Sequence, residues 1–155
     1  MRKIDDLLSE YGESHQNHFN KMVHWVCVPL IFFSIVGLIW SIPFPFASEQ
    51  VPFLNWATLV LLLVLIYYMN LSVSLFFGML IITSLFAVAC YLVEQYSPWP
   101  LWAVSLTIFV LAWIGQFYGH KVEGKKPSFL KDIQFLLIGP AWLMSFVFQK
   151  LGIRY

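Results

Sequence analysis

Charged side chains are scarce in this sequence. Asp, Glu, Lys and Arg make up 11% of its 155 residues, whereas a soluble domain carries about 25%. No lysine or arginine lies between Met22 and His120, and only Glu49 and Glu94 are charged in that stretch. This composition excludes a globular domain surrounded by water. The lysines and arginines adjoin apolar segments and form no separate basic patch, so we expect no binding of nucleic acid.

Cysteine and the common catalytic motifs are rare or missing. The two cysteines, Cys27 and Cys90, lie in apolar segments, which favours buried thiols over a disulfide. The sequence has no CxxC, GxSxG, P-loop or GxGxxG motif. Redox-thiol, α/β-hydrolase and nucleotide chemistry are therefore not expected, and a catalytic group must come from another residue type.

Long apolar segments dominate instead, and 60% of the residues are hydrophobic. A helix needs roughly 20 apolar residues to cross a membrane. We predict an all-α fold, a polytopic membrane helix bundle that forms a single integral membrane domain over residues 1–155. It has about four spanning helices, whose expected ranges are 21–40, 54–69, 71–93 and 101–118.

Proline, asparagine and glycine mark the expected interruptions. Three prolines in residues 41–53 exclude a helix there. Asn70 is expected to separate the second span from the third, and Pro98 and Pro100 mark the next turn. The last apolar segment has Gly139–Pro140 in its middle, so we predict a broken C-terminal helix that is re-entrant, interfacial or a fifth span.

The first residues are predicted to form a short amphipathic helix. Within residues 3–17 the apolar side chains fall at helical spacing, at Ile4, Leu7, Leu8 and Tyr11. This pattern predicts a helix that lies in the membrane interface. It has acids where a signal peptide would be apolar, so we expect the first span to be retained. Asn20 is the expected N-cap of that span.

The basic residues predict the orientation in the membrane. With four spans, the N-terminus and residues 119–132, which we expect to form a polar loop, lie on one side of the membrane. Both segments are rich in lysine and arginine, whereas the loops on the other side contain only Glu49 and Glu94. The positive-inside rule places the basic side in the cytoplasm. We expect a multi-pass protein of a bacterial inner membrane, or of the endoplasmic reticulum in a eukaryote, with its histidines on the cytoplasmic side.

The four histidines fall at the two polar ends of the apolar tract. His15, His18 and His24 precede or open the first span, and His120 follows the fourth. On one continuous helix His15 and His24 would lie about 13.5 Å apart along the axis and on opposite faces. One metal ion can bind both only if the helix breaks between them, and Asn17 and Asn20 predict such a break.

Several metal sites fit these residues. Glu123 lies three residues after His120, on the same helix face. Two histidines and one carboxylate form the facial site of non-haem Fe(II) oxygenases, whereas three or four histidines suit Zn, Fe or Cu equally. Gln116, one turn before His120, is a candidate for a hydrogen bond to a metal ligand. Haem is not favoured, because ligands for haem in a bundle normally lie within the helices.

Ordered motifs extend along essentially the whole chain. They are Tyr11-x3-His15-x4-Asn20-x3-His24-x4-Pro29, Trp113-Ile-Gly-Gln116-Phe-Tyr-Gly119-His120 with Glu123 and Lys125-Lys-Pro127, and Ile138-Gly139-Pro140. In these motifs the chain resembles the fungal 2-hydroxy fatty acid dioxygenases and their bacterial relatives.

The resemblance implies an Fe(II)-dependent membrane enzyme of fatty acid α-oxidation. Such an enzyme uses O2 to convert a 2-hydroxy fatty acid to the acid one carbon shorter and CO2. By position, the family's catalytic and metal-binding histidines are His15, His24 and His120. His18 and Glu123 are further candidate ligands. The candidates for contact with the ligands or with the substrate are Tyr11, Asn20, Gln116 and Lys121.

A non-catalytic function is the alternative. The same histidines would bind a structural or transported metal in a small membrane scaffold or carrier. Metal analysis and O2 consumption separate this alternative from a dioxygenase. Both hypotheses place the protein in contact with membrane lipid.

Overall fold

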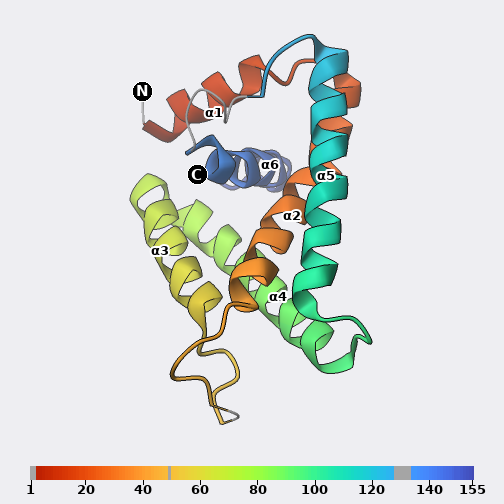
Figure 1. Ribbon diagram of the computed structural model, residues 1–155. Helices are drawn as coiled ribbons and strands as arrows, with labels where there is room; N and C mark the ends of the chain where they lie inside the picture. Colours follow the sequence, from red (N-terminus) through yellow and green to blue (C-terminus); the bar gives the residue numbers. More distant parts are fainter. Residues whose placement is uncertain (1–2, 49, 128–133) are drawn as a thin grey trace.

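The computed structural model describes residues 3–48, 50–127 and 134–155, and Figure 1 presents its ribbon. Within these ranges the regular structure is entirely helical, as predicted. The helices are α1 (Lys3–Glu13), α2 (His18–Trp40), α3 (Trp56–Leu71), α4 (Val73–Tyr96), α5 (Leu101–Glu123) and α6 (Phe135–Leu151). Helix α2 is central, since it contacts α3, α4, α5 and α6.

Three of the helices are long and apolar enough to cross a membrane. They are α2, α4 and α5, whereas α3 and α6 are shorter apolar helices of 16 and 17 residues. The prediction of about four spans is therefore supported for three of them. The outer faces expose large apolar side chains such as Leu63, Ile81 and Ile114, a surface that suits lipid better than water.

The start of α2 differs from the expected one. The helix begins at His18 instead of residue 21, and Asn17, not Asn20, is its N-cap. The Asn17 side chain accepts hydrogen bonds from the backbone N–H groups of Phe19 and Asn20. The predicted break between two helices exists, but it covers residues 14–17, one turn earlier than expected.

Two further boundaries correct the predictions. Asn70 lies inside α3, and the break between α3 and α4 is at Ser72, whose hydroxyl accepts a hydrogen bond from the backbone N–H of Leu75. Helix α5 continues through His120 to Glu123, so the polar loop begins five residues later than predicted. Gly124 ends the helix with a φ of 74°, a left-handed conformation that glycine adopts without strain.

The C-terminal helix is continuous, so the predicted break at Gly139–Pro140 is wrong. Pro29 in α2 and Pro140 in α6 each remove one backbone donor, but packing against other helices keeps both helices intact. Gly139 has a different role from the one inferred. A Cβ atom there would lie 2.9 Å from the Tyr11 hydroxyl oxygen, so glycine permits close contact between α6 and α1.

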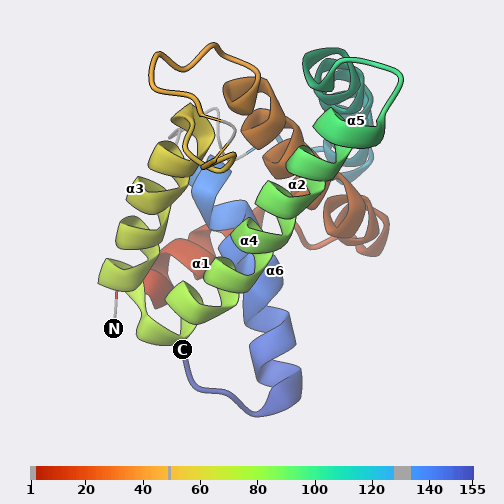
Figure 2. The ribbon, with the colours of Figure 1, turned by 90° about the horizontal axis from the view of Figure 1, so that it is seen from below.

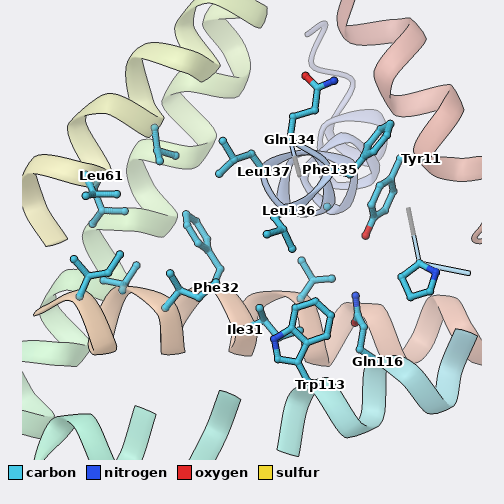
Figure 3. A pocket seen from close by; sticks show the side chains of 18 of the residues that line it. Tyr11, Ile31, Phe32, Leu61, Trp113, Gln116, Gln134, Phe135, Leu136 and Leu137 are labelled. Atoms are coloured by element: carbon cyan, nitrogen blue, oxygen red, sulfur yellow. The ribbon is translucent and has the colours of Figure 1, made fainter. Parts of the chain in front are cut away.

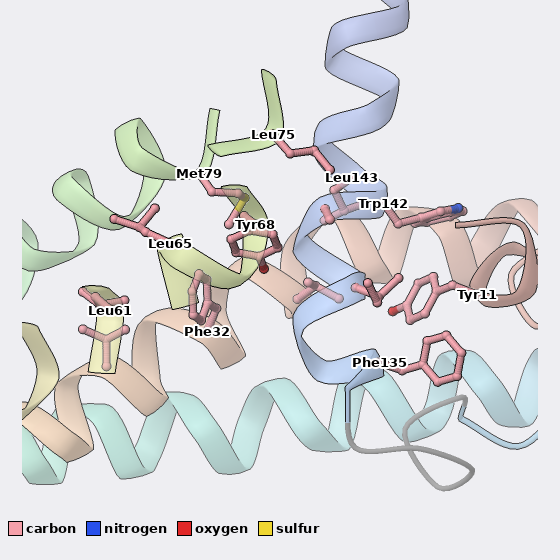
Figure 4. Close-up of a cluster of buried hydrophobic side chains, with 14 of the residues drawn as sticks. Tyr11, Phe32, Leu61, Leu65, Tyr68, Leu75, Met79, Phe135, Trp142 and Leu143 are labelled. Atoms are coloured by element: carbon pink, nitrogen blue, oxygen red, sulfur yellow. The ribbon is translucent and has the colours of Figure 1, made fainter. Parts of the chain in front are cut away.

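The apolar face of α1 packs against protein, and the position of this helix in the membrane interface stays a prediction. Ile4, Leu7, Leu8 and Tyr11 are buried, and α1 packs on α6. Figure 4 shows Tyr11 near Phe135 and Trp142 at one side of the main hydrophobic cluster. The view from below shows α1 beside α6 (Figure 2).

Candidate metal centre

Three of the four histidines converge in the structure. His15 lies in the turn between α1 and α2, His24 in the second turn of α2, and His120 in the last turn of α5. One ring nitrogen from each lies within 4.8 Å of the other two, a group that could hold a metal ion. All three side chains are buried. The predicted meeting of the two polar ends is therefore observed.

Hydrogen bonds orient two of the three rings. Nδ1 of His15 lies 2.6 Å from the carbonyl oxygen of Tyr11, and Nδ1 of His24 lies 2.8 Å from that of Asn20. Because a carbonyl oxygen only accepts, each Nδ1 must carry the hydrogen. In the neutral rings each Nε2 atom then presents a lone pair, which is the form in which imidazole binds metals.

The two Nε2 atoms face each other. They are 2.8 Å apart, and two lone pairs at this distance repel unless a positive centre lies between them. Two nitrogens that bind one metal ion at right angles lie about 3 Å apart, given metal–nitrogen bonds of 2.0–2.1 Å. The distance between His15 and His24 is therefore compatible with a shared metal ion.

The third ring has an unpaired nitrogen. Nδ1 of His120 is buried and has no hydrogen-bond partner among the described residues. Such a buried nitrogen is costly unless it binds a proton donor or a metal. The centroid of this ring is 4.9 Å from those of both His15 and His24. The three histidines thus fit a metal ion by their geometry and by the atoms they leave unpaired.

Aromatic side chains surround His15. The Tyr11 ring stacks on it with centroids 4.2 Å apart and an angle of 13°, and Trp142 of α6 lies 5.2 Å away. Burial, together with the nearby His120 and Lys21, lowers the pKa of His15 to about 4 against the opposing effect of the Tyr11 carbonyl. The ring is therefore neutral at pH 7 and able to bind a metal without first losing a proton. Burial also raises the pKa of Tyr11, so its hydroxyl stays protonated.

Glu123 lies outside the group of converging ligand atoms. Its carboxylate accepts hydrogen bonds from the backbone N–H groups of Gln16 and Asn17, at 2.8 and 2.9 Å, and from Nδ2 of Asn20 at 3.1 Å. Its oxygens therefore hold the turn between α1 and α2. A negative charge there also stabilises the N-terminus of α2. Glu123 connects the helix of His120 to the turn that positions His15 and His24.

Asn20 is buried against α5 beside this bridge. Its Nδ2 also donates to the carbonyl oxygen of Ser14, so the side chain closes the turn from inside. A Cβ atom on Gly119 would lie only 2.5 Å from Oδ1 of Asn20. Glycine at this position therefore lets α2 approach α5 closely enough for the histidines to meet.

The remaining candidates divide into two groups. His18 and Lys121 are exposed, and neither belongs to the group of converging ligand atoms. Tyr11 and Gln116 are buried and line a cavity that His120 also lines. In Figure 3 the Tyr11 hydroxyl and the Gln116 amide point toward one another at one end of this cavity.

The cavity has a volume of about 470 Å³ and extends between α2, α3, α5 and α6. Sequence reasoning did not find it, because its walls are apolar residues that look like ordinary membrane-helix positions. Their spacing of three or four residues along α2 is the only trace of it in the sequence. These residues are Val28, Ile31, Phe32, Ile35, Val36 and Ile39.

Trp142 and the close-contact glycines, Gly119 and Gly139, were also missed as parts of the site. Gly119 and Gly139 do occur in the ordered motifs, next to His120 and Pro140. A glycine within an apolar helix, directly beside a candidate ligand or a proline, is a signal of close backbone approach that a sequence reading can use.

Three comparisons relate the chain to known proteins. A search of curated proteins and a search of solved structures each found no significant match. A protein-family model, described as 2-hydroxy-palmitic acid dioxygenase Mpo1-like, matches residues 1–151. The match covers all three converging histidines and the cavity. The chain therefore belongs to the Mpo1-like 2-hydroxy-palmitic acid dioxygenase family.

Proposed function

We propose that this protein is an Fe(II)-dependent dioxygenase of fatty acid α-oxidation, which converts a 2-hydroxy fatty acid and O2 to the fatty acid one carbon shorter and CO2. The observation that carries the proposal is the convergence of three buried imidazoles at the polar end of an apolar cavity. Membership of a family named for dioxygenase activity supports it.

The reaction balances without an external reductant. The bond between C1 and C2 breaks, C1 leaves as CO2, and C2 becomes the new carboxyl carbon. These two carbons together lose four electrons, which is the number that O2 accepts. One oxygen atom leaves as water, with the hydrogens of the 2-hydroxyl group and of C2. The absence of the common nucleotide-binding motifs is consistent with such a self-sufficient reaction.

In this proposal His15, His24 and His120 hold the iron. When bound, the iron would supply the redox chemistry that couples O2 to oxidation of the substrate. Tyr11 and Gln116 face the same end of the cavity as His120. We assign them to the carboxyl and 2-hydroxyl groups of the substrate, as a hydroxyl donor and an amide that can donate and accept. Asn20 and Glu123 keep the histidines in position.

The site lies at the basic edge of the molecule, which we place in the cytoplasm. Lys21 and Lys121 flank the histidines, and the positive-inside rule assigns such an edge to the cytoplasmic face. The substrate then reaches the metal from the membrane, with its apolar tail among the helices. Reporters fused after residues 20 and 125 test this orientation, and reporters on opposite sides of the membrane would refute it.

The decisive experiment measures O2 consumption with 2-hydroxypalmitate by purified protein reconstituted with Fe(II). We expect His15→Ala, His24→Ala and His120→Ala to lose at least 100-fold in activity. The matched control is His18→Ala, which removes an exposed histidine from the same segment and should retain near-normal activity. Equal O2 consumption by all of these proteins would refute the assignment of the ligands.

Metal analysis separates the dioxygenase from a scaffold or carrier. The iron-reconstituted wild type should contain one iron per chain and release CO2 from the substrate. If the protein binds metal but consumes no O2 with any 2-hydroxy fatty acid, the non-catalytic alternative is the correct one. If it binds no transition metal at all, both hypotheses fail.

A further inference from the structure

The cavity beside the histidines has one polar end and one apolar end. His120, Gln116 and Tyr11 line the polar end, and Oε1 of Gln116 is buried with no hydrogen-bond partner among the described residues. Gln134 also lines the cavity, but Figure 3 shows its amide pointing away from it. An unpaired buried amide oxygen is costly, which indicates that a polar ligand group belongs at this end.

The rest of the cavity follows α2 away from the histidines. Its lining residues on this helix extend from Val28 to Ile39, which at 1.5 Å per residue gives about 16 Å, the length of roughly a dozen methylene groups. On α3, one face lines the same space, through Ala57, Val60 and Val64. The volume of about 470 Å³ falls within the range of small-molecule sites.

The apolar end opens toward the outside of the helix bundle. Val60 is 38% exposed, and Ile35 and Ile39 are partly exposed. These positions lie on apolar helices, two of them on α2, which is long enough to cross a membrane. A chain that leaves the cavity here enters lipid instead of water, so no charged or strongly polar ligand suits this end.

We propose that this cavity holds the acyl chain of the substrate, with its carboxyl end at Gln116 and Tyr11, and that side chains at the far end, Ile39 and Val60, determine which chain lengths bind. The inference rests on the proposed function for the identity of the substrate. It goes beyond that function because it assigns the acyl site and its length determinants to named residues.

The first experiment fills the far end from α3. Val60→Trp adds a large side chain at a partly exposed cavity position, and Leu59→Trp is its matched control. Leu59 is the preceding residue, is 39% exposed and does not line the cavity. Binding is measured on metal-free protein, by competition of 2-hydroxystearate and 2-hydroxyoctanoate with a fluorescent fatty acid.

We expect Val60→Trp to weaken the binding of 2-hydroxystearate at least tenfold and to leave that of 2-hydroxyoctanoate within twofold. Leu59→Trp should leave both within twofold. Unchanged binding of the long acid to Val60→Trp, or an equal loss for both acids, would overturn the proposal. A chain-length effect in the control variant Leu59→Trp would also overturn the proposal.

A second series varies the position of the obstruction along α2. Ile39→Trp blocks the far end, and Ile35→Trp blocks the cavity about 6 Å nearer to the histidines. The longest acid that binds tightly should therefore be shorter by roughly five carbons in Ile35→Trp than in Ile39→Trp. Thermal unfolding of each variant confirms folding, and an identical length limit in both folded variants contradicts the assignment.

These results are separable from those on the proposed function. If the iron-loaded wild type consumes no O2 but the variants change the chain-length limit in metal-free protein, the acyl site is correct and the dioxygenase assignment is wrong. If O2 is consumed and its dependence on chain length is the same in wild type and Val60→Trp, the acyl site lies elsewhere.

Discussion

Glu123→Gln tests how the two halves of the histidine site are connected. The substitution keeps the size of the side chain and one acceptor oxygen, but it removes the negative charge and replaces the other oxygen with an amide donor. In the native protein both oxygens accept hydrogen bonds from the turn between α1 and α2. The new N–H2 group can accept none of them, so at least one donor in the turn loses its partner.

The expected magnitude follows from these contacts. A hydrogen bond to a charged group contributes about 1.5–3 kcal/mol, and the exposed backbone of Gln16 and Asn17 places the loss near the lower limit. Water can replace part of the hydrogen bonding that the turn loses. We therefore expect Glu123→Gln to lower the free energy of unfolding by about 1–2 kcal/mol. Because the turn also positions His15 and His24, metal affinity should fall about 10- to 100-fold.

The assay is a Co²⁺ titration followed by the visible absorption of the bound ion, with thermal unfolding of the metal-free protein as a second measurement. The spectrum distinguishes a positioning residue from a ligand. If Glu123 acts only through the turn, the spectrum of the saturated variant keeps its shape while the affinity falls. Glu13→Gln is the matched control, since it removes the same charge from an exposed position at the end of α1, and it should bind Co²⁺ with affinity within twofold of wild type.

Two results would refute the reasoning. Wild-type affinity together with wild-type stability would mean that the carboxylate does not hold the turn in solution. A changed absorption spectrum at saturation would mean that Glu123 binds the metal directly, and that its contacts with Gln16, Asn17 and Asn20 are replaced when metal is present.

Two other predictions concern helix packing and pH. Gly119→Ala should gain about 1 kcal/mol of helix propensity but lose more stability through the overlap of its Cβ with Oδ1 of Asn20. Unfolding measurements should therefore show net destabilisation, and Co²⁺ binding should be weaker. A more stable variant with unchanged Co²⁺ binding would contradict this packing. His15 binds a proton less readily in the folded state, with a pKa of about 4, than in the unfolded state near 6.5. Its contribution to stability is therefore present above pH 6.5 and is lost as the pH falls toward 4. The unfolding temperature of metal-free wild type should decrease over this range more steeply than that of His15→Phe, and parallel curves would contradict the pKa shift.

Local patterns in the sequence were sufficient for much of the secondary structure. Apolar length and proline positions predicted the helices, the loop expected over residues 41–53 and the turn at Pro98 and Pro100. The boundaries failed where a tertiary contact outweighed the local signal. Helix α5 continues to Glu123 because its last turn is bound to the turn after α1, and α6 passes Pro140 because it is packed between α1 and α4.

By itself the sequence determined that the protein is helical and apolar, that its few histidines are the candidate ligands, and that its ordered motifs place it near one family. The tertiary structure decided which side chains act together. Only folding brings His15 and His24 within reach of His120, because their convergence depends on a turn whose amides are bound by a carboxylate more than 100 residues away. The fold also binds Glu123 to the turn and leaves His18 exposed. It forms a cavity largely from apolar residues of α2, α3 and α6, which the sequence does not distinguish from lipid-facing ones.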